Sequence, residues 1–436
     1  MIDRYTRPEM SRIWSDENKY RQWLEVELAT AEALAQTKDV PQEAARALRK
    51  HASFSLQRIQ EIEREVKHDV IAFTTAVSES LAEAGEAGAS RWLQYGLTSN
   101  DVVDTAQALM VRAASDVILS GISELATVLK RRAFEFKDTV QIGRTHGIHA
   151  EPITFGLKLA LWYDEVQRNF TRFSAAAEGM RVGKISGAVG TFGHIGPQAE
   201  ERICQRLGLR PAAIASQVIS RDRHANYVAT LALIAATLEK IALEIRHLQR
   251  TEVREVEEPF AEGQKGSSSM PHKRNPVTSE QICGLARVVR SNAQAAFENV
   301  ALWHERDISH SSVERIILPD STSAVDYMLA RTIWLISGMR VSPARMQRNL
   351  DLTRGLVFSG QLLLDLTAAG MLREEAYKVV QGHAMNAWEQ DGDFRNAIES
   401  DKAITKYLSP QTIEDSFSVS RQLRNIDQIF QRVFPT

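Results

Sequence analysis

The stretch DRHANYVATLALIAATLEKIALEIRHLQRTEVRE, residues 222–255, decides the fold class of this chain. It runs for 34 residues without a glycine or a proline, the residues that most often interrupt helices. Apolar residues dominate from Ala225 to Leu238, where the charges of Glu239 and Lys240 end the run. That run is too short to cross a bilayer, which needs ~20 residues, and it indicates a helix buried on nearly all sides. A helix over 222–255 would be ~51 Å long, beyond the size of a small domain.

The same periodicity recurs on both sides of this stretch. Leu24, Leu28, Ala31 and Leu34 repeat every three or four residues, whereas strand-like alternation is nearly absent. The sequence therefore predicts an all-α fold. Its helical stretches are 101–137, 152–181, 222–255, 277–303, 322–338 and 343–353, with shorter ones at 372–389, 394–407 and 410–416. Long apolar helices build an extended bundle, and we expect copies of the chain to associate and bury their apolar surface; a monomeric bundle is the alternative.

Composition excludes several classes of protein. The chain has 436 residues, 44% of them hydrophobic and 25% charged, as in an ordinary globular protein. A net charge of -2 gives no basic field, so we expect no nucleic-acid partner. Cys204 and Cys283 lack metal-ligand spacing and fit small buried residues in a reducing compartment. The N-terminus has no apolar signal core, and we expect a cytoplasmic protein without a membrane partner.

The segment GSSSMPHKRNP, residues 266–276, looks least like a helix or a strand. Glu257-Glu258-Pro259 and Gly263 extend it upstream, which makes a loop of about 20 residues. A loop of that length inside a compact domain is a lid, a binding loop or disordered. Helical patterns flank it on both sides and anchor it. The segment therefore predicts an active-site loop.

The segment GRTHGIHAEP, residues 143–152, is the second unusual one. Pro152 is well placed to open the next helix. His146, His149 and Glu151 lack the helical spacing of a zinc site, so a metal is disfavoured and none is expected. Histidines without a role are a further alternative. A general acid is favoured, because an imidazole titrates near neutral pH.

Two shorter segments precede long helical stretches. Lys67-His68-Asp69 leads into an apolar run and fits a solvated helix end as well as a binding site. Gly96 to Asp101 precedes the stretch 101–137, and Ser99 or Asn100 is placed to cap that helix. Free N–H groups and hydroxyls at a helix start also form a seat for an anion.

Residues 303–315, WHERDISHSSVER, place Arg306 and Arg315 around serines and histidines. Arginine forks with neighbouring hydroxyls suit a phosphate dianion, and the alternative is a surface cluster of ion pairs. Gln217 lies in a short turn-like stretch and is a weak signal alone.

Taken together and in this order, the segments resemble the fumarase/aspartase superfamily, whose signature loop has the form G-S-S-x-M-P-x-K-x-N-P. Within it the chain is similar to the adenylosuccinate lyase family, through Arg4 to Met10, Lys67-His68-Asp69, Gly96 to Ser99, Gly143 to Gly147 and Lys273-Arg274-Asn275. The resemblance runs essentially end to end. Ile153 departs from it, where many relatives carry a threonine.

This resemblance implies a three-domain, all-helical protomer and a homotetramer around a twenty-helix core, with each active site shared between protomers. Breaks near Gly85 to Gly88 and Gly355 to Gly360 suggest domains over residues 1–100, 101–355 and 356–436, with the signature loop at 257–276. The implied reaction is β-elimination of fumarate from adenylosuccinate, giving AMP, and from the succinylated ribotide SAICAR, giving AICAR. No cofactor is implied.

The resemblance also implies catalytic roles. Ser267 is the base that removes a proton next to a carboxylate, and His146 protonates the leaving nitrogen. Lys273 and the loop N–H groups stabilise the developing charge. Glu280 orients His146, and His68 contacts substrate anions and is a further catalytic candidate.

The implied binding residues form three groups by ligand. The residues expected to bind the phosphate and nearby groups are Arg4, Tyr5, Ser311, Ser312 and Arg315. The succinyl carboxylates fall to Thr98, Ser99, Gln217, Ser268, Lys273 and Asn275. The remaining contacts fall to Lys67, His68, Asp69, Gln281 and Arg306.

Two alternatives remain at this point. The first is another superfamily lyase, such as argininosuccinate lyase or a carboxymuconate cycloisomerase, whose substrates carry no phosphate. The second is a helical scaffold without catalysis, which the joint presence of Ser267, His146, Lys273 and Glu280 disfavours.

Overall fold

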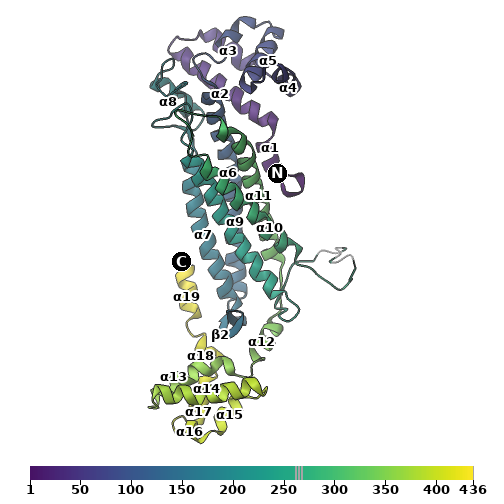
Figure 1. Cartoon of the computed structure of the whole chain (residues 1–436), viewed down its shortest axis with the longest axis vertical. Helices are drawn as coiled ribbons and strands as arrows, with labels where there is room; N and C mark the ends of the chain where they lie inside the picture. The colour runs from purple at the N-terminus through teal and green to yellow at the C-terminus, as the bar shows by residue number, and fades with distance from the viewer. Residues whose placement is uncertain (261–262, 264–265, 267–268, 436) are drawn as a thin grey trace. The chain divides into compact units, whose positions relative to one another are not determined.

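The computed structural model describes residues 1–260, 263, 266 and 269–435. It is predominantly helical, which confirms the predicted all-α class (Figure 1). The α-helices are α1 (Pro8–Ile13), α2 (Asp16–Gln36), α3 (Gln42–His51), α4 (Leu56–Val66), α5 (Asp69–Glu83), α6 (Ser99–Glu135), α7 (Phe155–Gly179), α8 (Pro197–Arg206), α9 (Asp222–Leu248), α10 (Val277–Glu298), α11 (Ser309–Gly338), α12 (Pro343–Asp351), α13 (Ser359–Ala368), α14 (Arg373–Glu389), α15 (Phe394–Ser400), α16 (Lys402–Thr405), α17 (Pro410–Ser416), α18 (Val419–Gln422) and α19 (Ile426–Val433).

Short strands complete the described part of the chain. They form three two-stranded sheets. β1 (Val140–Thr145) pairs with β2 (Ile148–Thr154) and β5 (Val256–Glu257) with β6 (Arg340–Val341), both antiparallel, while β3 (Val182–Gly183) pairs in parallel with β4 (Arg210–Pro211). No helix in the described residues is long and apolar enough to cross a membrane.

The chain divides into two compact units. The first holds Met1–Ser123, Gln167–Glu239 and Gln281–Arg331, and the second holds Glu124–Val166, Lys240–Glu280 and Thr332–Thr436. The helices α6, α7, α9, α10 and α11 contribute residues to both units. The division into domains over 1–100, 101–355 and 356–436 stays a prediction.

Helices α2 to α5 of the first unit lie together (Figure 1), and their side chains form a core rich in aromatic residues. Tyr20 stacks on Phe73 at 5.8 Å between ring centroids, and Trp23 and Phe54 meet the same ring edge-on. Such aromatic pairs stabilise a core by about 1 kcal/mol each beyond their burial. Phe73 belongs to the first turns of α5, so this core fixes the start of α5 next to Lys67 and His68.

The bundle helices of the first unit are held together by buried polar contacts as well as apolar ones. Ser115 of α6 bonds to Tyr227 of α9 at 2.9 Å. Asn169 of α7 donates to Thr237 of α9 at 2.8 Å. Gly121 lies so close to Leu329 that an added Cβ would sit 3.2 Å from its side chain, so α6 and α11 approach each other closely there.

In the second unit a β-hairpin and helices α12 to α19 surround their own cores. Ile142 packs with Leu350, Leu362 and Phe394 in the cluster formed mainly by α13 to α17. The Glu255 carboxylate, fully buried, accepts hydrogen bonds from Arg144 at 2.7 Å and from Asn349 at 2.7 Å. Buried charges persist when they are paired in this way.

The expected helix over 152–181 begins only at Phe155, because Pro152 belongs to β2 and lies opposite Ile142. Thr154 then takes the capping position, accepting the Leu157 N–H at 3.1 Å. The long helix at 222–255 ends at Leu248, since the chain turns there and Glu255 joins β1 and α12.

Helix α11 begins at Ser309, earlier than the expected 322, and includes Pro319. The Asp307 carboxylate stabilises the start of the helix by accepting a hydrogen bond from the Ser309 N–H at 2.8 Å. Hydrogen bonds from Ser309 and Trp303 lower the pKa of Asp307 to about 2. Pro319 has no N–H, so the Arg315 carbonyl lacks its usual helical donor.

Candidate active site

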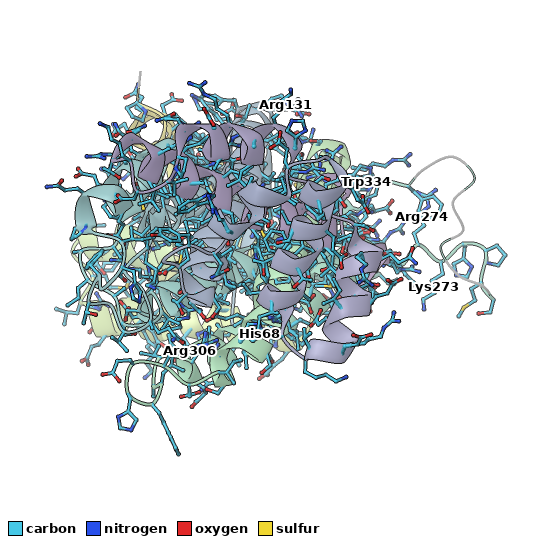
Figure 2. The ribbon with its side chains drawn as sticks, turned by 90° about the horizontal axis from the view of Figure 1, so that it is seen from above. His68, Arg131, Lys273, Arg274, Arg306 and Trp334 are labelled. Carbon is cyan, nitrogen blue, oxygen red and sulfur yellow. The ribbon has the colours of Figure 1, made fainter. Side chains whose placement is uncertain are left out.

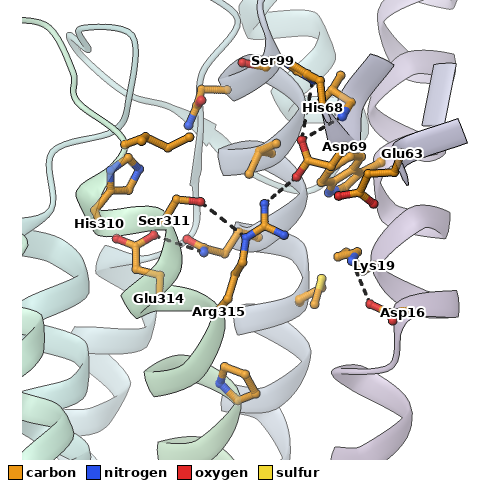
Figure 3. Close-up of a pocket in the computed structure, with 18 of the residues that line it drawn as sticks. Asp16, Lys19, Glu63, His68, Asp69, Ser99, His310, Ser311, Glu314 and Arg315 are labelled. Atoms are coloured by element: carbon orange, nitrogen blue, oxygen red, sulfur yellow. Dashed lines mark hydrogen bonds and ion pairs between the residues drawn. The ribbon is translucent and has the colours of Figure 1, made fainter. Parts of the chain in front are cut away.

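A cavity of about 550 Å³ lies within the first unit. Its lining comes from α2, the α4–α5 junction, the start of α6, the Arg306 segment and the start of α11 (Figure 3). The volume suits a ligand of nucleotide size. The structure brings together here seven of the predicted site residues: Lys67, His68, Asp69, Ser99, Arg306, Ser311 and Arg315.

Lys67 and His68 occupy the sharp junction between α4 and α5. Lys67 has φ 55°, a left-handed conformation that is costly for a residue with a Cβ. His68 caps α5: its Nδ1 accepts the Ile71 N–H at 3.3 Å. The neutral ring therefore carries its hydrogen on Nε2, which is left to donate to a ligand. The junction thus combines a helix cap with an N–H group that has no protein acceptor among the described residues.

Arg315 lies between Asp69 and Ser311 (Figure 3). Its Nη2 donates to the Asp69 carboxylate at 2.5 Å, and its Nε reaches Ser311 Oγ at 3.5 Å. Burial raises the pKa of Asp69, but the hydrogen bond and charge of Arg315 outweigh it, so that pKa lies below its usual range. An ionised Asp69 holds Arg315 in place; as a carboxylate it suits this task better than contact with an anionic substrate.

Arg306 connects the cavity to Gln217. Its Nη1 donates to Gln217 Oε1 at 3.0 Å, and the Gln217 N–H donates to the Glu305 carbonyl at 3.3 Å. The buried Arg306 Nε has no hydrogen-bond partner among the described residues. Since a buried donor without a partner is costly, this N–H is available to a ligand. Gln217 itself does not line the cavity.

The start of α6 forms another wall. The helix begins at Ser99, so Thr98 takes the capping position expected for Ser99 or Asn100. The Thr98 N–H donates to the Asp101 carboxylate at 2.8 Å, and Lys184 forms a fully buried ion pair with Asp101. The first N–H groups of a helix attract anions, which supports the carboxylate role predicted for Thr98 and Ser99.

Besides Thr98 and Gln217, four predicted residues of the first unit lie outside this cavity. Tyr5 packs edge-on against Tyr327 at 5.4 Å between centroids, and the Tyr327 hydroxyl donates to Gln281 at 3.4 Å. Tyr327 follows Arg315 by 12 residues on α11, a rise of ~18 Å. Tyr5 and Gln281 thus form a second group, which contacts Tyr327 of the same helix. The other two, Arg4 and Ser312, are exposed.

The remaining candidates belong to the second unit. His146 and Gly147 form the two-residue turn of the β1–β2 hairpin, with φ 55° and 82°. Lys273 is exposed on the segment that loops outward before α10 (Figure 2). Glu280 is exposed in the first turn of α10. Ser267 and Ser268 lie outside the described residues.

The described parts of the signature loop are fixed at its base. The buried Glu258 carboxylate accepts from the Thr278 and Ser279 N–H groups at 3.2 and 2.7 Å, which caps α10. Asn275 Nδ2 donates to the Gly266 carbonyl at 3.1 Å. A Cβ on Gly266 would meet the Lys273 carbonyl oxygen at 2.1 Å, so only glycine fits there. Asn275 therefore has a structural contact besides the substrate role predicted for it.

Comparison with known proteins assigns the family. Residues 3–291 match the family model described as lyase, and residues 355–433 match the model described as adenylosuccinate lyase C-terminus. The chain is 54% identical over 433 residues to the adenylosuccinate lyase of Bacillus subtilis (strain 168), with 99% of both chains covered. The chain belongs to the adenylosuccinate lyase family. The predicted resemblance is thereby confirmed, and the chain is a lyase.

Solved structures place this family within a wider fold. The 3-carboxy-cis,cis-muconate lactonizing enzyme of Pseudomonas putida has a TM-score of 0.90 at 29% identity, covering 98% of this chain and 96% of that one. A fumarate lyase from Mesorhizobium sp. BNC1 has a TM-score of 0.89 at 27% identity, covering 99% of both. The higher identity and the C-terminal match favour the adenylosuccinate lyase family over the muconate enzymes.

Some cavity residues of this adenylosuccinate lyase family member escaped sequence reasoning. Trp14, Lys19 and Glu63 line the cavity, with Lys19 paired to Asp16 at 2.8 Å. A Lys–Asp pair three residues apart at a helix start looks like ordinary helix stabilisation in the sequence. The three side chains come from the end of α1, from α2 and from α4, and only the packing of these segments brings them to one cavity.

Proposed function

We propose that this chain catalyses the elimination of fumarate from adenylosuccinate, giving AMP, and from SAICAR, giving AICAR, in purine nucleotide biosynthesis. The observation that carries the proposal is the meeting of Arg306, Ser311 and Arg315 with His68 and Ser99 in one cavity of a chain from this family. Arginine forks and a serine hydroxyl suit a phosphate. The start of α6, which lines the same cavity, suits a carboxylate. Both substrates carry a phosphate and a succinyl group.

The elimination needs a base, an acid and charge stabilisation. We assign the base to Ser267, which removes the proton next to the succinyl carboxylate. That proton is very weakly acidic, so the doubly charged intermediate must be stabilised, and Lys273 with loop N–H groups supplies this. We assign the acid to His146, which returns a proton to the leaving nitrogen as the carbon–nitrogen bond breaks. Glu280 orients His146 in this assignment. No cofactor takes part in it.

We further propose that the active protein is a cytoplasmic homotetramer with sites shared between protomers. Large apolar side chains support association: Leu233 on α9 is 52% exposed, Val288 on α10 41% and Ile316 on α11 59%. The two groups of predicted substrate residues that contact α11 at Arg315 and at Tyr327 support shared sites. Arg315 and Tyr327 are ~18 Å apart along that helix, too far to hold one phosphate.

Turnover tests the reaction. Purified protein is added to adenylosuccinate, the ultraviolet absorbance is followed, and AMP and fumarate are quantified at the end. Equal amounts of both products support the proposal. Absence of turnover, with argininosuccinate or carboxymuconate consumed instead, contradicts it. Arg315→Met serves as a variant that loses a phosphate donor, and Arg58→Met, an exposed arginine of α4, is its control.

Mixing inactive variants tests the shared sites. His146→Ala and Arg315→Met proteins are mixed under conditions that exchange subunits, and hybrid sites with both intact groups restore activity. The control mixes His68→Ala with Arg315→Met, whose altered residues line the same cavity of one chain. Exchange without recovered activity in the first mixture contradicts sharing between the cavity and His146.

A further inference from the structure

A cluster of charges lies beneath the cavity of the first unit and has no place in the proposed reaction. Arg221 pairs with Asp104 of α6 and with Glu314 of α11, and their side chains are only 1%, 0% and 4% exposed. Arg221 and Glu314 also reach the cavity lining. Burial of three charged groups is expensive unless each is fully bonded. The three side chains must therefore keep one arrangement in which every charged group is paired.

Every N–H of the Arg221 guanidinium is used. Two donate to the Asp104 carboxylate at 2.7 and 2.8 Å, and two to Glu314 at 2.9 and 3.2 Å. The fifth donates to the Ile219 carbonyl at 2.7 Å. Asp104 in turn accepts the Ile219 N–H at 2.8 Å. Lysine has three donors and lacks the planar fork, so it cannot reproduce this arrangement.

Each partner of Arg221 belongs to a segment that carries proposed substrate contacts. Asp104 lies five residues after Ser99 on α6, and Glu314 directly precedes Arg315 on α11. Ile219 lies two residues after Gln217, which bonds to Arg306. A single side chain therefore joins the carboxylate end of the cavity to its phosphate end.

The two histidines beside this cluster carry no charge near neutral pH. Burial and the charge of Arg221 lower the pKa of His224 to about 3, so its ring is neutral. His224 Nε2 lies 2.8 Å from Gln107 Oε1, and Gln107 Nε2 donates to Glu314 at 3.4 Å. Burial and the charge of Arg221 likewise lower the pKa of His310 to about 4. Arg221 is thus the cation that two carboxylates share.

We propose that Arg221 is a positioning residue, which sets the spacing between the succinyl-binding start of α6 and the phosphate-binding start of α11. The proposal rests on the proposed function. A substrate held at both ends gains from the fixed spacing, because the second contact forms at a high effective concentration. Each product contacts only one end of the cavity, so its binding does not depend on the fixed spacing. Loss of Arg221 therefore weakens binding of the linked substrate far more than binding of either product.

The test compares Arg221→Lys with wild type by three measurements: kcat/KM for adenylosuccinate and the separate inhibition constants of AMP and fumarate. We expect kcat/KM to fall by about 100-fold, as when reacting groups shift by ~1 Å. Both inhibition constants should stay within about 3-fold, under 1 kcal/mol. The control is Arg223→Lys, two residues away, whose guanidinium bonds the Gly179 carbonyl at 3.0 Å.

Two results overturn the proposal. In one, kcat/KM of the folded variant stays within about 3-fold of wild type. In the other, AMP or fumarate binding weakens as much as kcat/KM, which marks a general structural role. If Arg221→Lys does not fold, Glu314→Gln, which keeps the shape of the side chain, undergoes the same three measurements with the same criteria. Failure of the proposed function is recognised separately, because wild type then shows no turnover of adenylosuccinate.

Discussion

The Asp69 carboxylate at the start of α5 accepts a hydrogen bond of 2.5 Å from Arg315 on α11, 246 residues later in the chain. The pair closes one side of the cavity and points the guanidinium toward Ser311 (Figure 3). Half of the Arg315 side chain remains exposed, so a phosphate can approach it.

Asp69→Asn is expected to raise KM for adenylosuccinate by about 10-fold with kcat changed by less than about 3-fold, because a charge-assisted hydrogen bond of 1.5–3 kcal/mol is weakened. Steady-state kinetics measure both constants. Glu61→Gln is the matched control, since Glu61 pairs with Arg58 on the exposed face of α4. An unchanged KM in Asp69→Asn would show that Arg315 keeps its position without this partner.

Lys67 holds a left-handed conformation between two helices. Lys67→Gly should be more stable than Lys67→Ala by about 1 kcal/mol, because glycine adopts positive φ without strain. Denaturant unfolding of the two variants measures the difference. Both variants should show the same rise in KM for adenylosuccinate, since both lose the ammonium group. Equal stabilities would mean that the junction relaxes when the lysine is removed.

Glu258 holds the start of α10, just after the loop that carries Lys273 and Asn275. Glu258→Ala removes three hydrogen-bond acceptor contacts, the third being that of Ser279 Oγ at 2.6 Å. We expect the free energy of unfolding to fall by about 2 kcal/mol and kcat to fall with it. Glu257→Ala is the control, because that carboxylate is partly exposed and 3.4 Å from Arg274. A stable Glu258→Ala protein with normal kcat would contradict the role of this cap.

Glu27 of α2 should make stability depend on pH. Its carboxylate is buried and accepts the Gln94 N–H at 2.8 Å, while Oε1 has no partner among the described residues. Burial raises the pKa of Glu27 to about 7. Because the pKa of Glu27 is higher in the folded than in the unfolded protein, the folded state is more stable at low pH. This stability is fully present below the unfolded-state pKa and is lost as the pH rises from there through 7. The loss in the free energy of unfolding is about 3 kcal/mol.

Melting temperatures of wild type and Glu27→Gln between pH 5 and 8.5 measure this effect. The amide does not ionise, so the variant should gain on wild type as the pH rises. A difference between the two proteins that is constant over this range would show that Glu27 ionises freely in the folded state.

Helix periodicity was enough to predict the fold class, because long amphipathic and apolar runs leave few alternatives. The β1–β2 hairpin was missed, since Pro152 in a sequence reads as a helix start and its pairing with Ile142 is a tertiary contact. The start of α11 was missed for a related reason: the polar segment around Arg306 and the proline at 319 both argue against a helix locally.

The site was partly predictable for a different reason. Lys67, His68, Ser99 and Arg315 carry chemistry that is visible in short segments. Their meeting in one cavity depends on how α5, α6 and α11 pack, which no local pattern records. Arg221 shows the limit most clearly. In the sequence it looks like a charge before a helix, whereas in the fold its five donors are all used.

The fully bonded guanidinium of Arg221 also constrains how this protein evolves. Any single substitution of Arg221 leaves Asp104 and Glu314 as buried carboxylates without their cation. Loss of either carboxylate leaves the guanidinium with buried N–H groups that lack an acceptor. Each single change in the trio is therefore expected to lower stability unless a second change compensates for it. We therefore expect the three positions to change together or not at all, whereas exposed arginines such as Arg58 tolerate single substitutions.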